Sequence, residues 1–222
     1  FEFKEVIHVA AAKKEKKELK PTKKDLRIFL YMSKLGGISY ESLTERFGYS
    51  EDTIRKRFSK LNCIQRNEED VIENGKSITK YVYSLNKKGK EVMLQHDLNH
   101  HCGKYFGYEH LLKCEQELFR LVGRDELFDA KKDLKEMPIG IVALEDIQGE
   151  AEQRFKHEAN INILKKQGMS ISVVDFLYVD SKGESVAVEV ETSNYRKERR
   201  EAHYNYVKHV LQISDGNYKV VK

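Results

Sequence analysis

Three carboxylates near the end of the chain have the types and spacing of a metal site. Asp175, Glu189 and Glu191 lie in the stretch 171–194, ISVVDFLYVDSKGESVAVEVETSN, in which apolar and β-branched residues otherwise dominate. Acidic side chains on an apolar sheet are costly unless something neutralises them. Carboxylate oxygens are the ligands that hard divalent cations prefer. The stretch therefore predicts a site for Mg²⁺ or Mn²⁺.

The same stretch predicts two antiparallel strands joined by a tight turn at residues 180–183, Asp-Ser-Lys-Gly. If the turn centres on Lys182, Asp175 lies directly across from Glu189, and such cross-strand neighbours have Cβ atoms about 5 Å apart. Because side chains alternate along a strand, Glu189 and Glu191 share a face with Ala187, and the intervening valines point the other way. Two neighbouring carboxylates would then be close enough to bind one cation.

Helices are expected on both sides of this hairpin in the sequence. A helix over about 149–166 would place Glu158 beside its inner face, where it becomes a fourth candidate metal ligand. A basic helix over 195–211 begins with Arg196 and Lys197, and a short strand follows at 218–222. We therefore expect an α/β domain over residues 124–222, within an α+β chain.

Charge is distributed unevenly along the 222 residues. Residues 1–90 carry 21 Lys and Arg against 13 Asp and Glu, whereas the remainder carries 19 against 23. A basic front half suggests a polyanionic partner. We expect no membrane span, because no apolar run approaches about 20 residues, and we expect no secretory signal peptide. Three unpatterned cysteines fit a reducing cytoplasm.

Residues 22–95 predict three helices followed by a β-hairpin. The helices begin near Thr22, Ser39 and Ser50, and the third buries a stripe of apolar residues, Ile54, Phe58 and Leu61. The polar run NEEDVIENGKS predicts a long loop at the hairpin tip. This order of elements is that of a winged helix-turn-helix.

The patterns TxxIRKRFSKL and YSLNKKGKEV resemble those of bacterial winged-helix proteins. The resemblance implies that the third helix enters the major groove of double-stranded DNA and that the hairpin holds phosphates. The residues it assigns to DNA are Thr53, Arg55, Lys56, Arg57, Lys60, Lys76 and Lys80. A winged helix can instead serve as a dimerisation or protein-binding module, and this alternative stays open.

The segments around this domain have less specific patterns. Residues 1–21 predict a basic arm, either solvated or lying along phosphates. Residues 88–122 predict continuous helix, and residues 96–123 are expected to form a connector or a dimerisation surface. This region also gathers candidate zinc ligands, namely His96, His100, His101, Cys102, His110 and Cys114. Their spacing matches no usual zinc motif, so the connector is the preferred interpretation.

The order helix, Asp strand, Glu strand, helix, strand resembles the core of the restriction-endonuclease-like PD-(D/E)xK superfamily. In that comparison Asp175 and Glu189 match the motif acids, Glu158 matches the helix glutamate, and Glu191 stands where the motif has lysine. A glutamate cannot supply the positive charge that the lysine gives to the transition state. Lys197 or a nearby arginine would have to supply it, or the domain is catalytically silent.

Over the whole chain, the sequence is similar to the replication-relaxation family of bacterial plasmids and conjugative elements. The motifs that carry this similarity are DFLY at 175–178, VEVET at 188–192 and RREAHY at 199–204. It implies a cytoplasmic, dimeric DNA-binding accessory of plasmid replication or mobilisation, with a plasmid replication or mobilisation protein as a second partner. Two alternatives are a Mg²⁺-dependent endonuclease that uses the three acids and a winged-helix transcriptional regulator.

Overall fold

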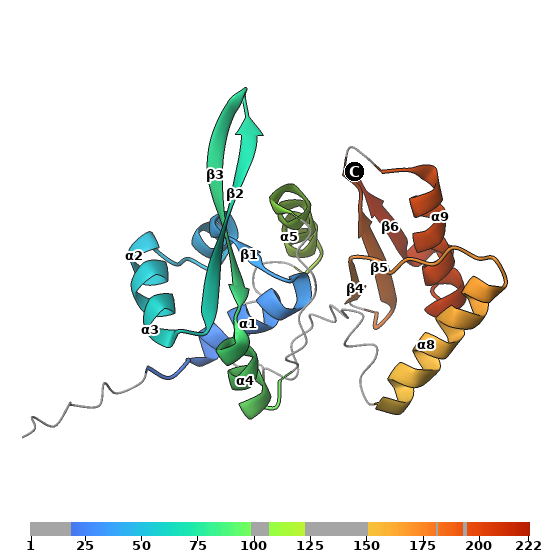
Figure 1. Cartoon of the computed structure of the whole chain (residues 1–222), viewed down its shortest axis with the longest axis horizontal. Coiled ribbons are helices and arrows are strands. Elements are labelled where there is room, and N and C mark those ends of the chain that lie inside the picture. The colour runs from blue at the N-terminus through green and yellow to red at the C-terminus, as the bar shows by residue number, and fades with distance from the viewer. Residues whose placement is uncertain (1–18, 99–106, 123–150, 181, 193–194) are drawn as a thin grey trace, which may run out of the picture.

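The computed structural model of the chain describes residues 19–98, 107–122, 151–180, 182–192 and 195–222. In these ranges the protein has a mixed α/β architecture with two three-stranded sheets, β1–β3–β2 and β4–β5–β6 (Figure 1). Most of the predicted basic arm, the segment 124–150, and the candidate zinc ligands His100, His101 and Cys102 lie outside the described residues.

The first helix, α1 (Lys23–Leu35), begins where the sequence predicts. The Thr22 hydroxyl accepts a hydrogen bond from the Asp25 amide, and the Asp25 carboxylate accepts one from the Thr22 amide. This reciprocal cap satisfies two amides that have no partner within the helix. Gly36 ends the helix in the left-handed region at φ 77°, which glycine adopts without a steric penalty.

A short strand and two helical segments follow. After β1 (Ile38–Ser39) come η1 (Ser42–Arg46), a π-helical turn, and then the segment 51–61, which is built from α2 (Glu51–Thr53), η2 (Ile54–Phe58) and α3 (Ser59–Leu61). The Ser50 hydroxyl caps this segment by accepting from the Thr53 amide at 3.2 Å. The predicted stripe of Ile54, Phe58 and Leu61 is buried, at 4% exposure or less.

The hairpin that follows differs from the predicted long loop. Strands β2 (Ile64–Glu73) and β3 (Lys76–Leu85) pair along their whole length and are joined by Asn74 and Gly75 alone. Both turn residues have positive φ, 52° and 76°, as a type I′ turn requires. Because β1 pairs with β3 only at residues 82 and 83, the outer part is two-stranded and projects from the molecule (Figure 1).

The predicted continuous helix over 88–122 is two helices. Helix α4 (Lys87–Gln95) ends in a turn at His96 and Asp97, where Asp97 has φ 55°, and α5 (Tyr108–Val122) begins after residue 107. The apolar positions of the two helices therefore do not form one continuous stripe. Instead, α5 packs on β1 and on the sheet of the second half.

The second half is a layered unit around the sheet β4 (Phe176–Val179), β5 (Ser185–Val190) and β6 (Tyr218–Val221). Strand β5 pairs antiparallel with β4 and parallel with β6. Figure 1 shows α5 on one side of this sheet and α8 (Ala151–Lys166) and α9 (Lys197–Asn205) on the other. Helix α9 continues as η4 (Tyr206–Val210), and a short turn, η5 (Asp215–Asn217), precedes β6.

The two faces of this sheet bury different residues, as the alternation predicts. Val188 and Val190 join the core that contains Leu111 of α5, whereas Ala187 packs with Tyr206 of η4. The side chains of Glu189 and Glu191, which alternate with these valines, therefore lie on the face of the sheet that α9 covers. Among the described helices, none has the length and apolar content needed to cross a membrane.

Candidate carboxylate site and DNA-facing surface

Asp175 and Glu189 have the predicted cross-strand relationship. Phe176 pairs with Val188 and Leu177 with Ala187, so Asp175, one residue before β4, lies opposite Glu189. The strand is shorter than the predicted one, because residues 171–175 do not pair. The Asp175 side chain takes the place of the missing backbone acceptor, since its Oδ2 accepts a hydrogen bond from the Val190 amide at 2.7 Å.

The two carboxylates meet imidazoles from opposite sides of the sheet. Asp175 Oδ1 lies 3.0 Å from His110 Nε2 on α5. Glu189 Oε2 lies 3.3 Å from His203 Nδ1 on α9, but the two atoms are not aligned for a hydrogen bond. Both side chains are nearly inaccessible, with 1% of Glu189 and 2% of His203 exposed. Tyr195 Oη lies 2.8 Å from the other ring nitrogen of His203.

Burial controls the protonation of this pair. Burial, with the added negative charge of Asp175, raises the pKa of Glu189 to about 9. Burial also lowers the pKa of His203, although the charge of Asp175 opposes that shift. Both shifts favour the uncharged forms at neutral pH. The pair can therefore remain buried without leaving two uncompensated charges in the interior.

The carboxylate of Glu191 forms an ion pair with an arginine. It is 4% exposed and accepts two hydrogen bonds from Arg200, at 2.5 and 2.6 Å. The guanidinium of Arg199 lies 4.7 Å from the centre of the Tyr195 ring, and its positive charge partly opposes the rise in the pKa of Glu189. Lys197, the predicted substitute for the motif lysine, is exposed at the first position of α9. Within the described residues, Arg200 thus pairs with Glu191, and Arg199 acts on Glu189 through its charge.

The predicted fourth ligand does not join the carboxylates. Glu158 is exposed on α8. In the described ranges, the set of possible ligand atoms that does come together belongs to His110, Cys114 and Asp175, which lie within 4.8 Å of one another. Sequence spacing placed His110 and Cys114 one helical turn apart, but it gave no signal that Asp175 lies beside them.

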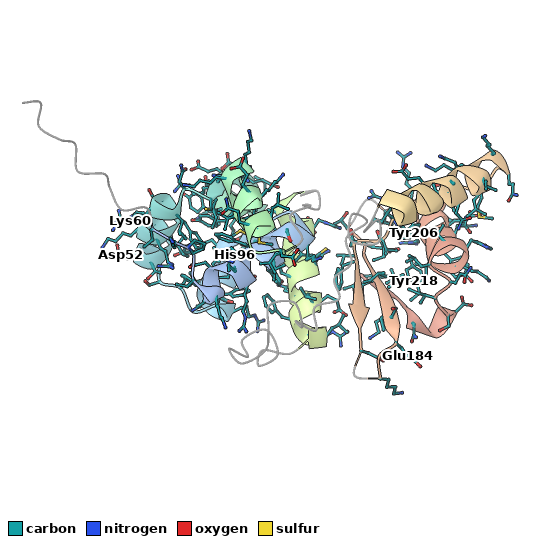
Figure 2. All side chains as sticks on the ribbon, turned by 90° about the horizontal axis from the view of Figure 1, so that it is seen from below. Asp52, Lys60, His96, Glu184, Tyr206 and Tyr218 are labelled. Atoms are coloured by element: carbon teal, nitrogen blue, oxygen red, sulfur yellow. The ribbon has the colours of Figure 1, made fainter. Side chains whose placement is uncertain are left out.

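Of the cations predicted to contact DNA, three on the segment 51–61 are exposed. Arg55 and Lys56 have 76% and 62% of their side chains exposed, and Lys60 is also exposed. Asp52 forms ion pairs with both Arg55, at 3.2 Å, and Lys56, at 2.5 Å. Figure 2 shows Asp52 and Lys60 at the end of the molecule opposite the sheet that carries Tyr218. Thr53 is half-buried, and its hydroxyl forms a hydrogen bond with the hydroxyl of Ser50.

Two predicted phosphate contacts are instead engaged within the protein. Arg57 is only 24% exposed and binds the buried carboxylate of Asp25. Lys80 is 18% exposed and pairs with Glu41 at 3.2 Å and Glu73 at 3.0 Å. Spacing on the helix and strand could not reveal these partners, which come from other elements. Lys76 is exposed at the hairpin tip, as predicted.

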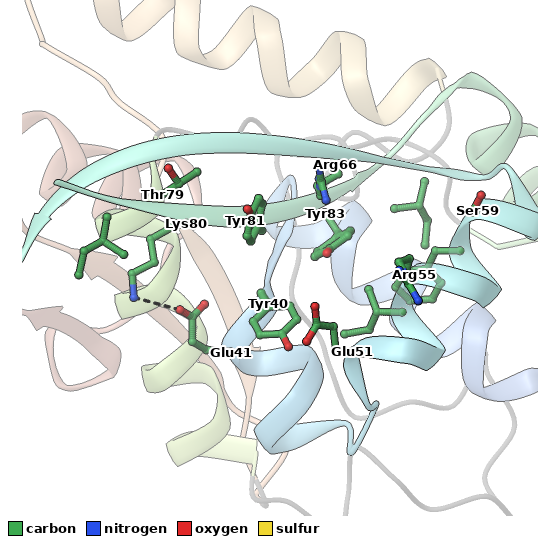
Figure 3. A pocket seen from close by; sticks show the side chains of 14 residues that line it. Tyr40, Glu41, Glu51, Arg55, Ser59, Arg66, Thr79, Lys80, Tyr81 and Tyr83 are labelled. Atoms are coloured by element: carbon green, nitrogen blue, oxygen red, sulfur yellow. Dashed lines mark hydrogen bonds and ion pairs between the residues drawn. The ribbon is translucent and has the colours of Figure 1, made fainter.

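A groove of about 640 Å³ separates the segment 51–61 from the hairpin (Figure 3). Its lining combines aromatic side chains with both signs of charge, including Tyr40, Tyr81, Tyr83, Arg55, Arg66 and Glu51. The Arg66 guanidinium lies 4.8 Å from the centre of the Tyr81 ring. The lining of this groove thus carries both signs of charge. The exposed surface formed by Arg55, Lys56 and Lys60 is cationic, and Arg55 belongs to both.

Comparisons with known proteins leave the family open. No family model and no curated protein matches the chain. A search of solved structures gives a match to the crystal structure of smu.1604c from Streptococcus mutans UA159, with 18% identity. The match covers 64% of this chain and 81% of that one, with a TM-score of 0.21. A similarity this weak carries no argument about fold or function.

Proposed function

We propose that residues 22–95 form a winged helix that binds double-stranded DNA through the segment 51–61. The observation that carries this proposal is the two-sided character of that segment. Its apolar stripe is buried in the core, whereas Arg55, Lys56 and Lys60 project into solvent. Exposed cations on a helix that stands at the surface are what phosphate binding and major-groove entry require.

In this proposal the helix contributes more to DNA affinity than the hairpin does. Strand β2 carries four acids, Glu68, Glu69, Asp70 and Glu73, and Lys80 is held in ion pairs. These acids would repel phosphates along most of the hairpin. Of the two lysines on β3, Lys76 at the hairpin tip is exposed and could contact a phosphate.

We further propose that the protein is an accessory of plasmid or mobile-element replication or mobilisation and acts as a homodimer. The resemblance of residues 175–178, 188–192 and 199–204 to motifs of the replication-relaxation family supports this narrower role. A dimer would present two such helices to a palindromic site.

The second half of the protein is, in this proposal, nuclease-like and catalytically silent. A hydrolytic site must admit a phosphodiester and its metal, yet Glu189 and Glu191 are 1% and 4% exposed. Arg200 occupies both oxygens of Glu191. The second candidate function, a Mg²⁺-dependent endonuclease, is favoured by the cross-strand placement of Asp175 opposite Glu189.

A binding assay with matched charge variants tests the DNA proposal. Affinity for a mixed plasmid-derived duplex is measured by fluorescence anisotropy across a salt series, for wild type and for the double variant Lys56→Gln, Lys60→Gln. Each lost phosphate contact reduces the slope of log K against log salt by about 0.9, so the double variant should lose about 1.8.

The control removes the same charge from another exposed helix surface, with Lys165→Gln and Lys166→Gln on α8. This pair should leave the slope unchanged. Equal losses in the two double variants would mean that binding is diffuse, and no loss in either would exclude the segment 51–61 as the DNA surface.

A further inference from the structure

We propose that His110, Cys114 and Asp175 bind one transition-metal ion of the zinc class between α5 and the start of β4. The site differs from the hard-cation site that the acids suggest, because it uses an imidazole and a thiolate from the other side of the sheet. It is independent of the DNA-binding proposal, since none of its ligands lies on the segment 51–61.

The geometry of the three ligand atoms is close to that of a tetrahedral site. His110 and Cys114 are four residues apart on α5, so one helical turn brings the Cys114 sulfur within 3.9 Å of His110 Nε2. The same Nε2 atom lies 3.0 Å from Asp175 Oδ1. Zinc bonds of about 2.0–2.3 Å at tetrahedral angles separate ligand atoms by about 3.3–3.6 Å. All three ligand atoms lie within 4.8 Å of one another, so side-chain adjustments that bring them to these separations would complete the site.

The surroundings hold the ligands in place. Asp175 is oriented by the Val190 amide, which donates to Oδ2 and leaves Oδ1 directed at His110. A hydrogen bond of this kind to the outer oxygen is typical of carboxylates that bind metals. Cys114 is 3% exposed and is anchored on the buried face of α5. Three protein ligands leave a fourth position for water or for a further side chain.

A nearby buried acid has a polar atom without a hydrogen-bond partner among the described residues. Glu189, opposite Asp175 on the neighbouring strand, is 1% exposed, and its Oε2 atom makes no hydrogen bond within the described part of the chain. A divalent ion beside Asp175 would compensate the negative charge of that residue. Such an ion would also displace the proton of the Cys114 thiol, forming a metal–sulfur bond and releasing H⁺.

The donor set selects the metal. Thiolate and imidazole favour Zn²⁺ and Co²⁺, whereas Mg²⁺ and Mn²⁺ prefer oxygen ligands. Because His110 and Asp175 belong to segments 65 positions apart, the ion would fasten α5 to the C-terminal sheet. Metal binding would therefore stabilise the contact between the two halves of the protein.

Cobalt substitution tests the site in the full chain. Chelator-treated protein is titrated with Co²⁺ and followed by absorption spectroscopy. We expect a thiolate-to-cobalt charge-transfer band and the visible bands of tetrahedral Co²⁺, both removed by one equivalent of Zn²⁺. Cys114→Ser should abolish the charge-transfer band. Zinc affinity should fall by more than about 100-fold, since even changes to groups that only orient ligands cost about 10–100-fold.

Two further variants keep the test decisive. Asp175→Asn should weaken zinc binding but retain the sulfur band, whereas Cys102→Ser should change neither, because Cys102 is outside the proposed ligand set. Circular dichroism of each metal-free variant checks that it folds. Absence of bands in the wild type, or bands that depend on Cys102 and not on Cys114, would overturn the proposal. Either result leaves the DNA-binding measurements unaffected.

Discussion

Arg57 and Asp25 form an ion pair that fastens the segment 51–61 to the start of α1. Arg57 Nε lies 2.8 Å from Asp25 Oδ1, and Nη2 lies 2.5 Å from Oδ2. The same carboxylate caps α1 by accepting from the Thr22 amide. One buried acid thus fixes both the beginning of a helix and the position of the proposed DNA-binding segment.

The first prediction is that Arg57→Ala destabilises the protein. The substitution leaves the fully buried Asp25 carboxylate without its cation, which costs about 3 kcal/mol for pairs of this kind. Urea unfolding should show a lower midpoint with an unchanged slope. Lys60→Ala, an exposed cation on the same segment, should change stability by less than about 0.5 kcal/mol. Equal stability of the two variants would contradict the structural role of Arg57.

The second prediction concerns acid stability. Burial raises the pKa of Asp25, but hydrogen bonds from Arg57 and Thr22 outweigh it, and the net pKa is below its usual value of 3.8. The unfolded chain therefore binds this proton more readily, so the contribution to stability is present above pH 3.8 and is lost as pH falls through the folded pKa.

Unfolding midpoints measured from neutral to strongly acidic pH check this expectation. In Asp25→Asn, the part of the pH dependence that belongs to this window should disappear, and stability at neutral pH should already be reduced. A variant that retains the wild-type acid limb would show that other carboxylates cause it.

The third prediction is that Asp52→Asn strengthens non-specific DNA binding. Asp52 is 57% exposed and engages Arg55 and Lys56 in surface ion pairs, which are individually weak. Neutralising it removes a repulsive charge and frees two cations for phosphates. Affinity should rise at low salt and the salt slope should steepen. An unchanged or weaker affinity would mean that Asp52 contacts the bases or that this surface does not meet DNA.

The fourth prediction is that supercoiled plasmid remains intact with the wild-type protein and Mg²⁺ or Mn²⁺. Two of the acids that would bind the metal, Glu189 and Glu191, are buried, and Glu191 is held by Arg200. Nicking or linearisation followed on agarose gels measures the outcome. Cleavage that disappears in Asp175→Ala would establish the endonuclease alternative, whereas cleavage that persists in that variant would indicate a contaminant.

Local features of the fold were predictable because they depend on neighbouring residues. The caps at Thr22 and Ser50 and the stripe from Ile54 to Leu61 follow from side chains within one or two turns. The alignment of Asp175 with Glu189 follows from a turn centred at 182 and from the alternation of a strand. The Asn74–Gly75 turn also has a local signal, since Asn-Gly is a strong hairpin sequence, but the polar run around it favours a loop by composition.

The sequence by itself thus determined most local elements, the strand register around 182 and the presence of an acidic cluster. The tertiary structure alone decided which partner each charged group meets. Arg57 binds Asp25, Lys80 binds Glu41, and Asp175 meets His110, and in each pair the residues are more than 30 positions apart. Spacing along one helix or strand assigns a side chain to a face of that element. The identity of the group opposite depends on how separate elements pack, and no short-range pattern contains that information.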